Sequence, residues 1–187
     1  MRTATKRKSK ADPQSVCYSD KVNRTIYISG DIELPMASRF RRLFKALEHA
    51  AQDPITVEIN TPGGDEYAGM LIMDTIMLSK CKVVTRATGM AMSMGACILI
   101  AGDKRECLPM TSIMIHQGTC GVYARMEEFD VEVTELKRWE DRLWDLFDER
   151  TGKEKGFWKG LCAGKNKYMD AKEAAELKVV DKICGKG

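Results

Sequence analysis

The feature that most constrains the fold is a regular alternation between short β-branched runs and longer amphipathic segments. Strand character is found at 24–32, 54–59, 81–89 and 107–117, and a last short run, VVDKI, lies near the end of the chain. Strands that alternate with helices form parallel sheets joined by right-handed crossovers. The sequence therefore predicts an α/β fold built on a parallel sheet.

Helical character separates these strands. The segment ASRFRRLFKALEHAAQD places Phe40, Phe44 and Leu47 on one apolar face, and Ser38 is its predicted cap. A second helix is expected to open within NTPGGDEYAGM, a buried one to occupy 89–102, and a last one to cover 170–178. The 125–150 segment predicts a long helix that ends at Thr151-Gly152 and whose one apolar face includes Leu143 and Phe147.

Composition indicates one globular domain. The chain has 187 residues, 44% of them hydrophobic and 30% charged, and no apolar run approaches the ~20 residues that span a bilayer. Seven scattered cysteines, an odd number without a C-x-x-C pair, argue against a disulfide framework or a zinc site. Free thiols favour a reducing, cytoplasmic location. We expect a single domain at 21–187, with no metal and no membrane partner.

The first twenty residues differ from the rest in charge. MRTATKRKSK holds five basic residues and no acidic one, against a net charge of +3 for the whole chain, so the remainder is mildly acidic. A flexible, solvated arm at 1–20 explains such a run more simply than a nucleic-acid contact does. No nucleic-acid partner is therefore inferred.

Two residues are candidates for acyl chemistry. Ser93 is the one hydroxyl in the small apolar stretch GMAMSMGACILIAG, and His116 ends an apolar strand. A serine nucleophile needs a base that takes its proton and N–H donors for the charge that develops on the attacked oxygen. His116 can be the base, and the Gly63-Gly64 turn and the Met94 N–H can be the donors. Taken singly, each feature is more often structural. The chain lacks phosphate-loop, dinucleotide-binding and HExxH motifs.

Successive blocks of the chain resemble the Clp protease proteolytic subunit family. YISGDI, EINTPGGDEYAGMLIMDTI, GMAMSMGACILIAG, CLPMTSIMIHQ and MDAKEAAELKVVDKI follow the order of that family between residues 24 and 183. The resemblance implies a crotonase-like superhelix of repeated ββα units with a protruding long-helix handle. It also implies a serine endopeptidase without cofactors, in which Ser93 is the nucleophile, His116 the general base, and Gly64 and Met94 the donors of the oxyanion hole.

The resemblance also implies an assembly. Members of this family form two stacked seven-membered rings around a chamber, and an ATP-driven AAA+ unfoldase feeds unfolded polypeptide through the axial pore. The basic segment at 1–20 differs from the N-terminal loops of the family, which contact the unfoldase.

The third position of the catalytic triad departs from the family pattern. Asn166 aligns where the family has an aspartate, while nearby Asp170 aligns with a position that caps the next helix, with Glu173 completing a capping box. An asparagine can orient a histidine but cannot supply charge, and this loss is worth roughly 10⁴ in rate in one serine protease. Two alternatives to an active peptidase therefore remain: a weakly active or non-catalytic ring subunit and, with less support, a crotonase-like acyl-CoA enzyme.

Overall fold

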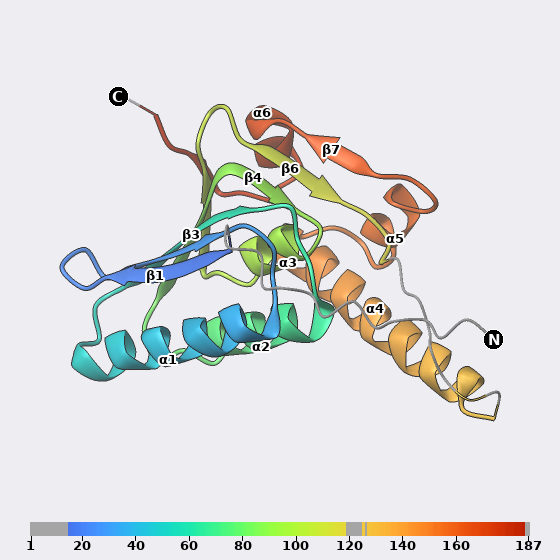
Figure 1. Cartoon of the computed structure of the whole chain (residues 1–187). Coiled ribbons are helices and arrows are strands. Elements are labelled where there is room, and N and C mark those ends of the chain that lie inside the picture. Colours follow the sequence, from blue (N-terminus) through green and yellow to red (C-terminus); the bar gives the residue numbers. More distant parts are fainter. Residues whose placement is uncertain (1–14, 119–124, 126, 186–187) are drawn as a thin grey trace.

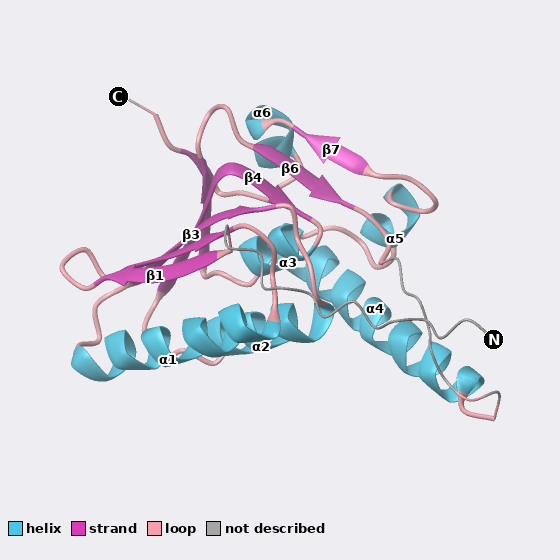
Figure 2. Cartoon of the chain, in the orientation of Figure 1, coloured by secondary structure: helices cyan, strands magenta, loops and turns pink. Residues whose placement is uncertain are grey.

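The chain folds around one mixed sheet in the computed structural model, which describes residues 15–118, 125 and 127–185 (Figure 1; Figure 2). The strands are β1 (Val16–Asp20), β2 (Thr25–Ser29), β3 (Ile55–Thr61), β4 (Val83–Met92), β5 (Lys104–Cys107), β6 (Ser112–Ile115), β7 (Lys167–Met169) and β8 (Lys182–Ile183). The helices are α1 (Leu34–Ala50), α2 (Glu66–Met77), α3 (Met94–Ile100), α4 (Phe129–Thr151), α5 (Phe157–Leu161) and α6 (Ala171–Glu176). The predicted α/β class is confirmed.

The sheet branches at β4. Strands β2, β3 and β4 run parallel side by side, and β1 adds to β2 in the antiparallel sense. The first part of β4 pairs with β5, whereas its last part, Met90–Met92, pairs in parallel with β6. Gly89 divides the two parts with a φ of 81°, which an L side chain rarely adopts. Two neighbouring parallel strands, β4 and β6, therefore end at the same edge of the sheet.

The core lies on one face of this sheet. Along β3 the burial alternates, so that Ile55, Val57 and Ile59 point inward while the residues between them are half-buried. Helices α1 and α2 lie together on the same side of the strands, and α1 contributes fully buried Phe40 and Phe44 (Figure 1). Every residue of α3 is buried, so this short helix is held on all sides.

Helix α4 extends away from the body of the fold (Figure 1). Its buried side chains, Trp144, Phe147, Asp148 and Thr151, all lie in the C-terminal third. There Asp148 accepts the N–H groups of Gly156 and Trp158, at 2.6 and 3.0 Å. Gly152 ends the helix in the left-handed conformation, as the sequence predicted. No helix in the described ranges is long and apolar enough to pass through a membrane.

Four predicted details are wrong. The strand expected at 107–117 is not continuous, because Cys107 ends β5, β6 covers only Ser112–Ile115, and 108–111 lie outside both. The 89–102 segment is not one helix, because β4 continues through Met92 and only Met94–Ile100 is helical. Ser38 is not a cap, because α1 already begins at Leu34, where Pro35 suits the first turn. The flexible segment expected at 1–20 includes β1, whose pairing with β2 orders 16–20, while residues 1–14 lie outside the described ranges.

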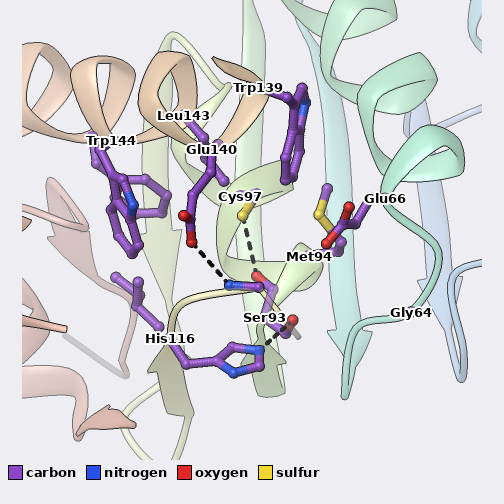
Figure 3. Close-up of a pocket in the computed structure, with 13 residues that line it drawn as sticks. Gly64, Glu66, Ser93, Met94, Cys97, His116, Trp139, Glu140, Leu143 and Trp144 are labelled. Atoms are coloured by element: carbon purple, nitrogen blue, oxygen red, sulfur yellow. Dashed lines mark hydrogen bonds between the residues drawn. The ribbon is translucent and has the colours of Figure 1, made fainter. Parts of the chain in front are cut away.

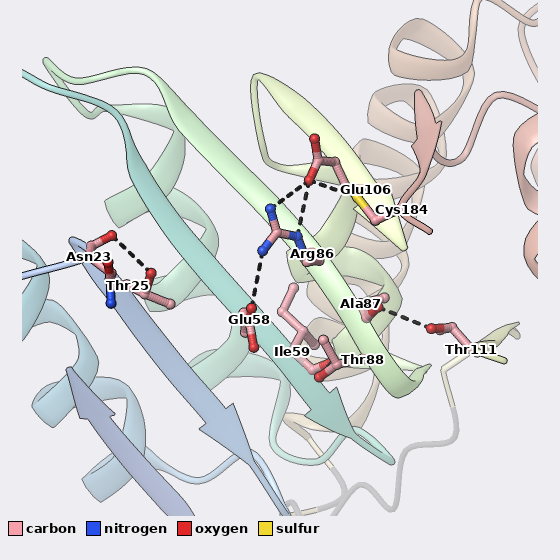
Figure 4. A network of polar contacts seen from close by, with 10 residues as sticks. All are labelled: Asn23, Thr25, Glu58, Ile59, Arg86, Ala87, Thr88, Glu106, Thr111 and Cys184. Carbon is pink, nitrogen blue, oxygen red and sulfur yellow. Dashed lines mark hydrogen bonds and ion pairs between the residues drawn. The ribbon is translucent and has the colours of Figure 1, made fainter. Parts of the chain in front are cut away.

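A charged network covers the face of the sheet opposite the core (Figure 4). Arg86 of β4 bonds Glu58 of β3 at 3.2 Å and Glu106 of β5 at 2.8 Å. Lys104 adds a 2.8 Å ion pair to Glu106, whose side chain is only 5% exposed. Burial alone would raise the pKa of Glu106, but hydrogen bonds from Lys104 and Arg86 prevail and lower it to about 2.

The Glu106 network predicts a pH-dependent stability. The unfolded carboxyl titrates near 4.5, so the charged, bonded form stabilises the fold fully above that pH and less as the pH falls toward about 2. We expect Glu106→Gln to lower the free energy of unfolding at pH 7 by about 2 kcal/mol. In urea titrations this difference should shrink between pH 4.5 and 3.

The exposed Glu176 provides a matched control for Glu106. Glu176→Gln should change stability by less than about 0.5 kcal/mol at either pH. A Glu106→Gln effect that stayed constant from pH 7 to pH 3 would contradict the linkage.

Candidate active site

Ser93 lies at the sharp turn between β4 and α3. Its φ of 52° and ψ of −120° are a strained combination for a residue with a side chain. The turn is held by backbone hydrogen bonds, because the Ser93 N–H donates to the Met114 carbonyl at 2.8 Å and the Ser93 carbonyl accepts the Ala96 N–H at 2.9 Å. A strained strand-to-helix turn of this kind presents a hydroxyl at the end of a sheet.

His116 follows β6 directly and reaches the same point. Its Nε2 lies 2.8 Å from the Ser93 Oγ, within hydrogen-bond distance (Figure 3). Both side chains are half-buried. The parallel register of β4 and β6, in which Met92 lies opposite Met114, brings the two residues together. The structure thus pairs the two residues that the sequence singled out.

The Gly63-Gly64 turn packs against Ser93. A Cβ on Gly63 would lie 2.8 Å from the Ser93 Cβ and 3.2 Å from the Met94 N, and one on Gly64 would lie 2.3 Å from the Ile32 carbonyl oxygen. Their φ angles of 110° and 146° also favour glycine. Among the described residues, the N–H groups of Gly64 and Met94 have no hydrogen-bond acceptor. Two backbone donors therefore lie beside the serine.

These residues open into one cavity of about 560 Å³, its mouth included. Gly64, Ser93, Met94 and His116 are among the residues that line it. The other described lining residues come from α2, α3, the end of β6, the segment after it and α4: Glu66, Cys97, Ile115, Gly118, Trp139, Glu140, Leu143, Trp144 and Phe147. A mainly apolar cavity with a few polar groups is typical of a substrate site.

Cys97 lines this cavity as a buried thiol. Burial raises the pKa of its thiol to about 12, so the thiolate is scarce at neutral pH. Its Sγ lies 3.3 Å from the Ser93 carbonyl oxygen, where it packs beneath the turn. Within the described ranges, no group of three or more His, Cys, Asp or Glu residues is arranged to hold a metal ion.

Asn166 lies outside the cavity lining. It is exposed, one residue before β7, and no hydrogen bond joins it to His116 among the described residues. Its backbone is nevertheless near His116: β6 and β7 pair up to Ile115 opposite Lys167, and His116 and Asn166 are the residues that adjoin this last pair. Opposed residues of antiparallel strands, such as Ile115 and Lys167, have Cβ atoms about 5 Å apart.

Asp170 is the N-cap of helix α6. Its Oδ1 accepts the Glu173 N–H at 2.9 Å and caps α6, as the sequence predicted, while the Glu173 carboxylate contacts Lys167.

The acidic and aromatic walls of the cavity were not found from the sequence. The predicted apolar face of the 125–150 helix included Leu143 and Phe147, and helical spacing from Leu143 reaches Trp139. Nothing local marked Glu66 or Glu140, because their approach depends on how α4 docks against α2.

Comparisons with known proteins agree with this arrangement. A sequence model described as Clp protease matches residues 9–187. An ATP-dependent Clp protease proteolytic subunit from Deinococcus radiodurans is 38% identical over 134 residues, which cover 69% of this chain and 65% of that protein, slightly less than two thirds of its length. An asparagine-to-aspartate mutant of ClpP1 from Listeria monocytogenes has a similar structure, with a TM-score of 0.81 and 30% identity over 89% of this chain and 94% of that one. The chain belongs to the Clp protease family.

Proposed function

We propose that the protein is a serine endopeptidase subunit of an ATP-dependent, self-compartmentalised protease. The observation that carries this proposal is the 2.8 Å contact between Ser93 Oγ and His116 Nε2 in a cavity that also presents two free backbone N–H groups. A hydroxyl, a base and two N–H donors are the groups that acyl transfer requires.

The chemistry follows from these positions. His116 Nε2 accepts the Ser93 proton as Oγ attacks the carbonyl carbon of a peptide bond. The N–H groups of Gly64 and Met94 donate to the oxygen that becomes negative. The protonated His116 then gives its proton to the leaving amine, which departs and leaves an acyl group on Ser93. In the second half of the reaction, His116 accepts a proton from a water molecule that attacks the acyl carbon. It then returns this proton to Ser93 Oγ as the acyl–oxygen bond breaks.

We further propose Asn166 as the group that orients His116. The opposed register of β6 and β7 supports this role, because it brings the two backbones together. An Asn166 side chain turned toward the ring would accept the Nδ1–H through its carbonyl oxygen, while its charge would remain zero. Asn166 is neutral, exposed and not hydrogen-bonded to His116. These properties favour the second candidate function, a weakly active subunit that serves mainly to build the ring.

Assembly into two stacked seven-membered rings completes the proposal. Phe129 and Val131 on the first turn of α4 are exposed and apolar, as suits a surface that another subunit covers. Unfolded polypeptide would reach the chamber from a AAA+ unfoldase. The proposed location is the cytoplasm, because the six described cysteines are all free thiols, as is usual in a reducing compartment.

Removal of the Ser93 hydroxyl tests the nucleophile. Ser93→Ala should lower turnover of a fluorogenic peptide by at least about 10⁴-fold and abolish labelling by a fluorophosphonate, because the attacking oxygen is gone. Ser112→Ala, on the strand that leads to His116 but outside the cavity lining, should keep both activities. Unchanged turnover by Ser93→Ala would reject the peptidase assignment.

Exchange of Asn166 for a charged residue tests the third position. Asn166→Asp should raise kcat by at least about tenfold, because a carboxylate stabilises the imidazolium that forms during attack. Asp170→Asn is the contrasting variant: it removes the charge, keeps a side-chain oxygen that can cap α6, and should leave kcat unchanged. The reverse outcome, a kcat that depends on Asp170 and not on Asn166, would move the third position to Asp170.

A further inference from the structure

Two carboxylates line the cavity beside Ser93 (Figure 3). Glu66 is the first residue of α2, and Glu140 lies in the middle of α4. Both reach Gly118, two residues after His116. The Glu140 Oε1 accepts the Gly118 N–H at 3.2 Å, and the Glu66 Oε1 lies so close that a Cβ on Gly118 would be only 3.0 Å from it. The two acids thus approach the same point, one from α2 and the other from α4.

Neither carboxylate has an ion-pair partner in the described part of the chain. The described residues that line the cavity include no Lys or Arg. Lys159 pairs with Asp141 at 2.6 Å, and Lys137 lines an adjacent cavity to which Glu66 and Glu140 also contribute. Burial, followed by the charges of Asp65 and Glu140, raises the pKa of the Glu66 carboxyl above its usual value. A bound cation would offset both the cost of burying the Glu66 charge and its repulsion by Glu140.

The remaining walls suit a long aliphatic side chain. Ile115, Leu143, Trp144 and Phe147 supply apolar surface, and the half-buried indole of Trp139 lines the cavity together with both acids. Lysine and arginine carry an apolar stem and a cationic end, and such an end also interacts favourably with an indole face. Ser93 lines the cavity, so the cavity can receive the side chain of the residue whose carbonyl Ser93 attacks.

We propose that Glu66 and Glu140 make this cavity selective for substrates with lysine or arginine on the acyl side of the cleaved bond. The inference rests on the proposed function, because it names the substrate class of the same site. Glu66 and Glu140 are then specificity-determining residues, and they act by charge complementarity at the end of an otherwise apolar cavity.

The test compares N-acetylated fluorogenic peptides that differ only at this residue: lysine, norleucine and glutamate. Norleucine has the stem of lysine without its ammonium group, and acetylation removes the competing cation of a free N-terminus. For the assembled full chain, kcat/KM should be at least about tenfold higher for lysine than for norleucine, and lowest for glutamate. The ratio of lysine to norleucine should fall in Glu66→Gln and Glu140→Gln, and approach one in the double variant.

Two further variants separate charge from structure. Glu132→Gln, the same chemical change on the exposed side of α4, should leave the ratio unchanged. Glu66→Lys should reverse the order, so that the glutamate peptide exceeds the lysine peptide. Labelling of Ser93 by an uncharged fluorophosphonate reports whether the catalytic end is intact in each variant.

The outcomes distinguish this inference from the function on which it rests. Ser93-dependent hydrolysis in which the wild type cleaves norleucine as well as lysine would overturn the inference alone, as would a ratio that survives in the double variant. Hydrolysis of all three peptides that does not depend on Ser93 would contradict the proposed function, and the inference with it.

Discussion

The parallel pairing of the last part of β4 with β6 is the constraint on which the rest of the site depends. The hydrogen bond from the Ser93 N–H to the Met114 carbonyl is the last link of this pairing. It fixes the strained Ser93 turn and carries β6 to the point where His116 follows. Without this pairing, nothing in the sheet would hold Ser93 and His116 next to each other.

The branch in the sheet makes this pairing possible. Strand β4 is shared, because β5 covers its first part and β6 its last part. At the change-over the Ala87 carbonyl accepts both the Leu108 N–H and the Thr111 hydroxyl, which turn the chain from β5 into β6. The charged network of Arg86 lies before the branch and the Ser93–His116 pair after it, so the two networks lie at different ends of β4.

Much of this arrangement could be predicted from the sequence, and the exceptions have physical causes. The alternation of apolar runs predicted the α/β class. Ser93, in an expected helix, and His116, at a strand end, were paired by their chemical roles, and the sheet edge they share came only from the structure. The helix expected at 89–102 was wrong in its first part, because small residues such as Gly89 and Ala91 lack the periodicity that distinguishes a strand from a helix. Glu66 and Glu140 escaped notice, because their proximity arises only when α4 packs across the end of α2.

Helix α4 is anchored at one end, and this has a consequence for the cavity. The strands hold Ser93 and His116, whereas Trp139 and Glu140 belong to α4, whose buried side chains are Trp144, Phe147, Asp148 and Thr151. The proposed recognition of the substrate side chain and the proposed attack on the peptide bond therefore depend on different elements. A shift of α4 would alter the space for that side chain and would leave the alignment of Ser93 and His116 to the strands.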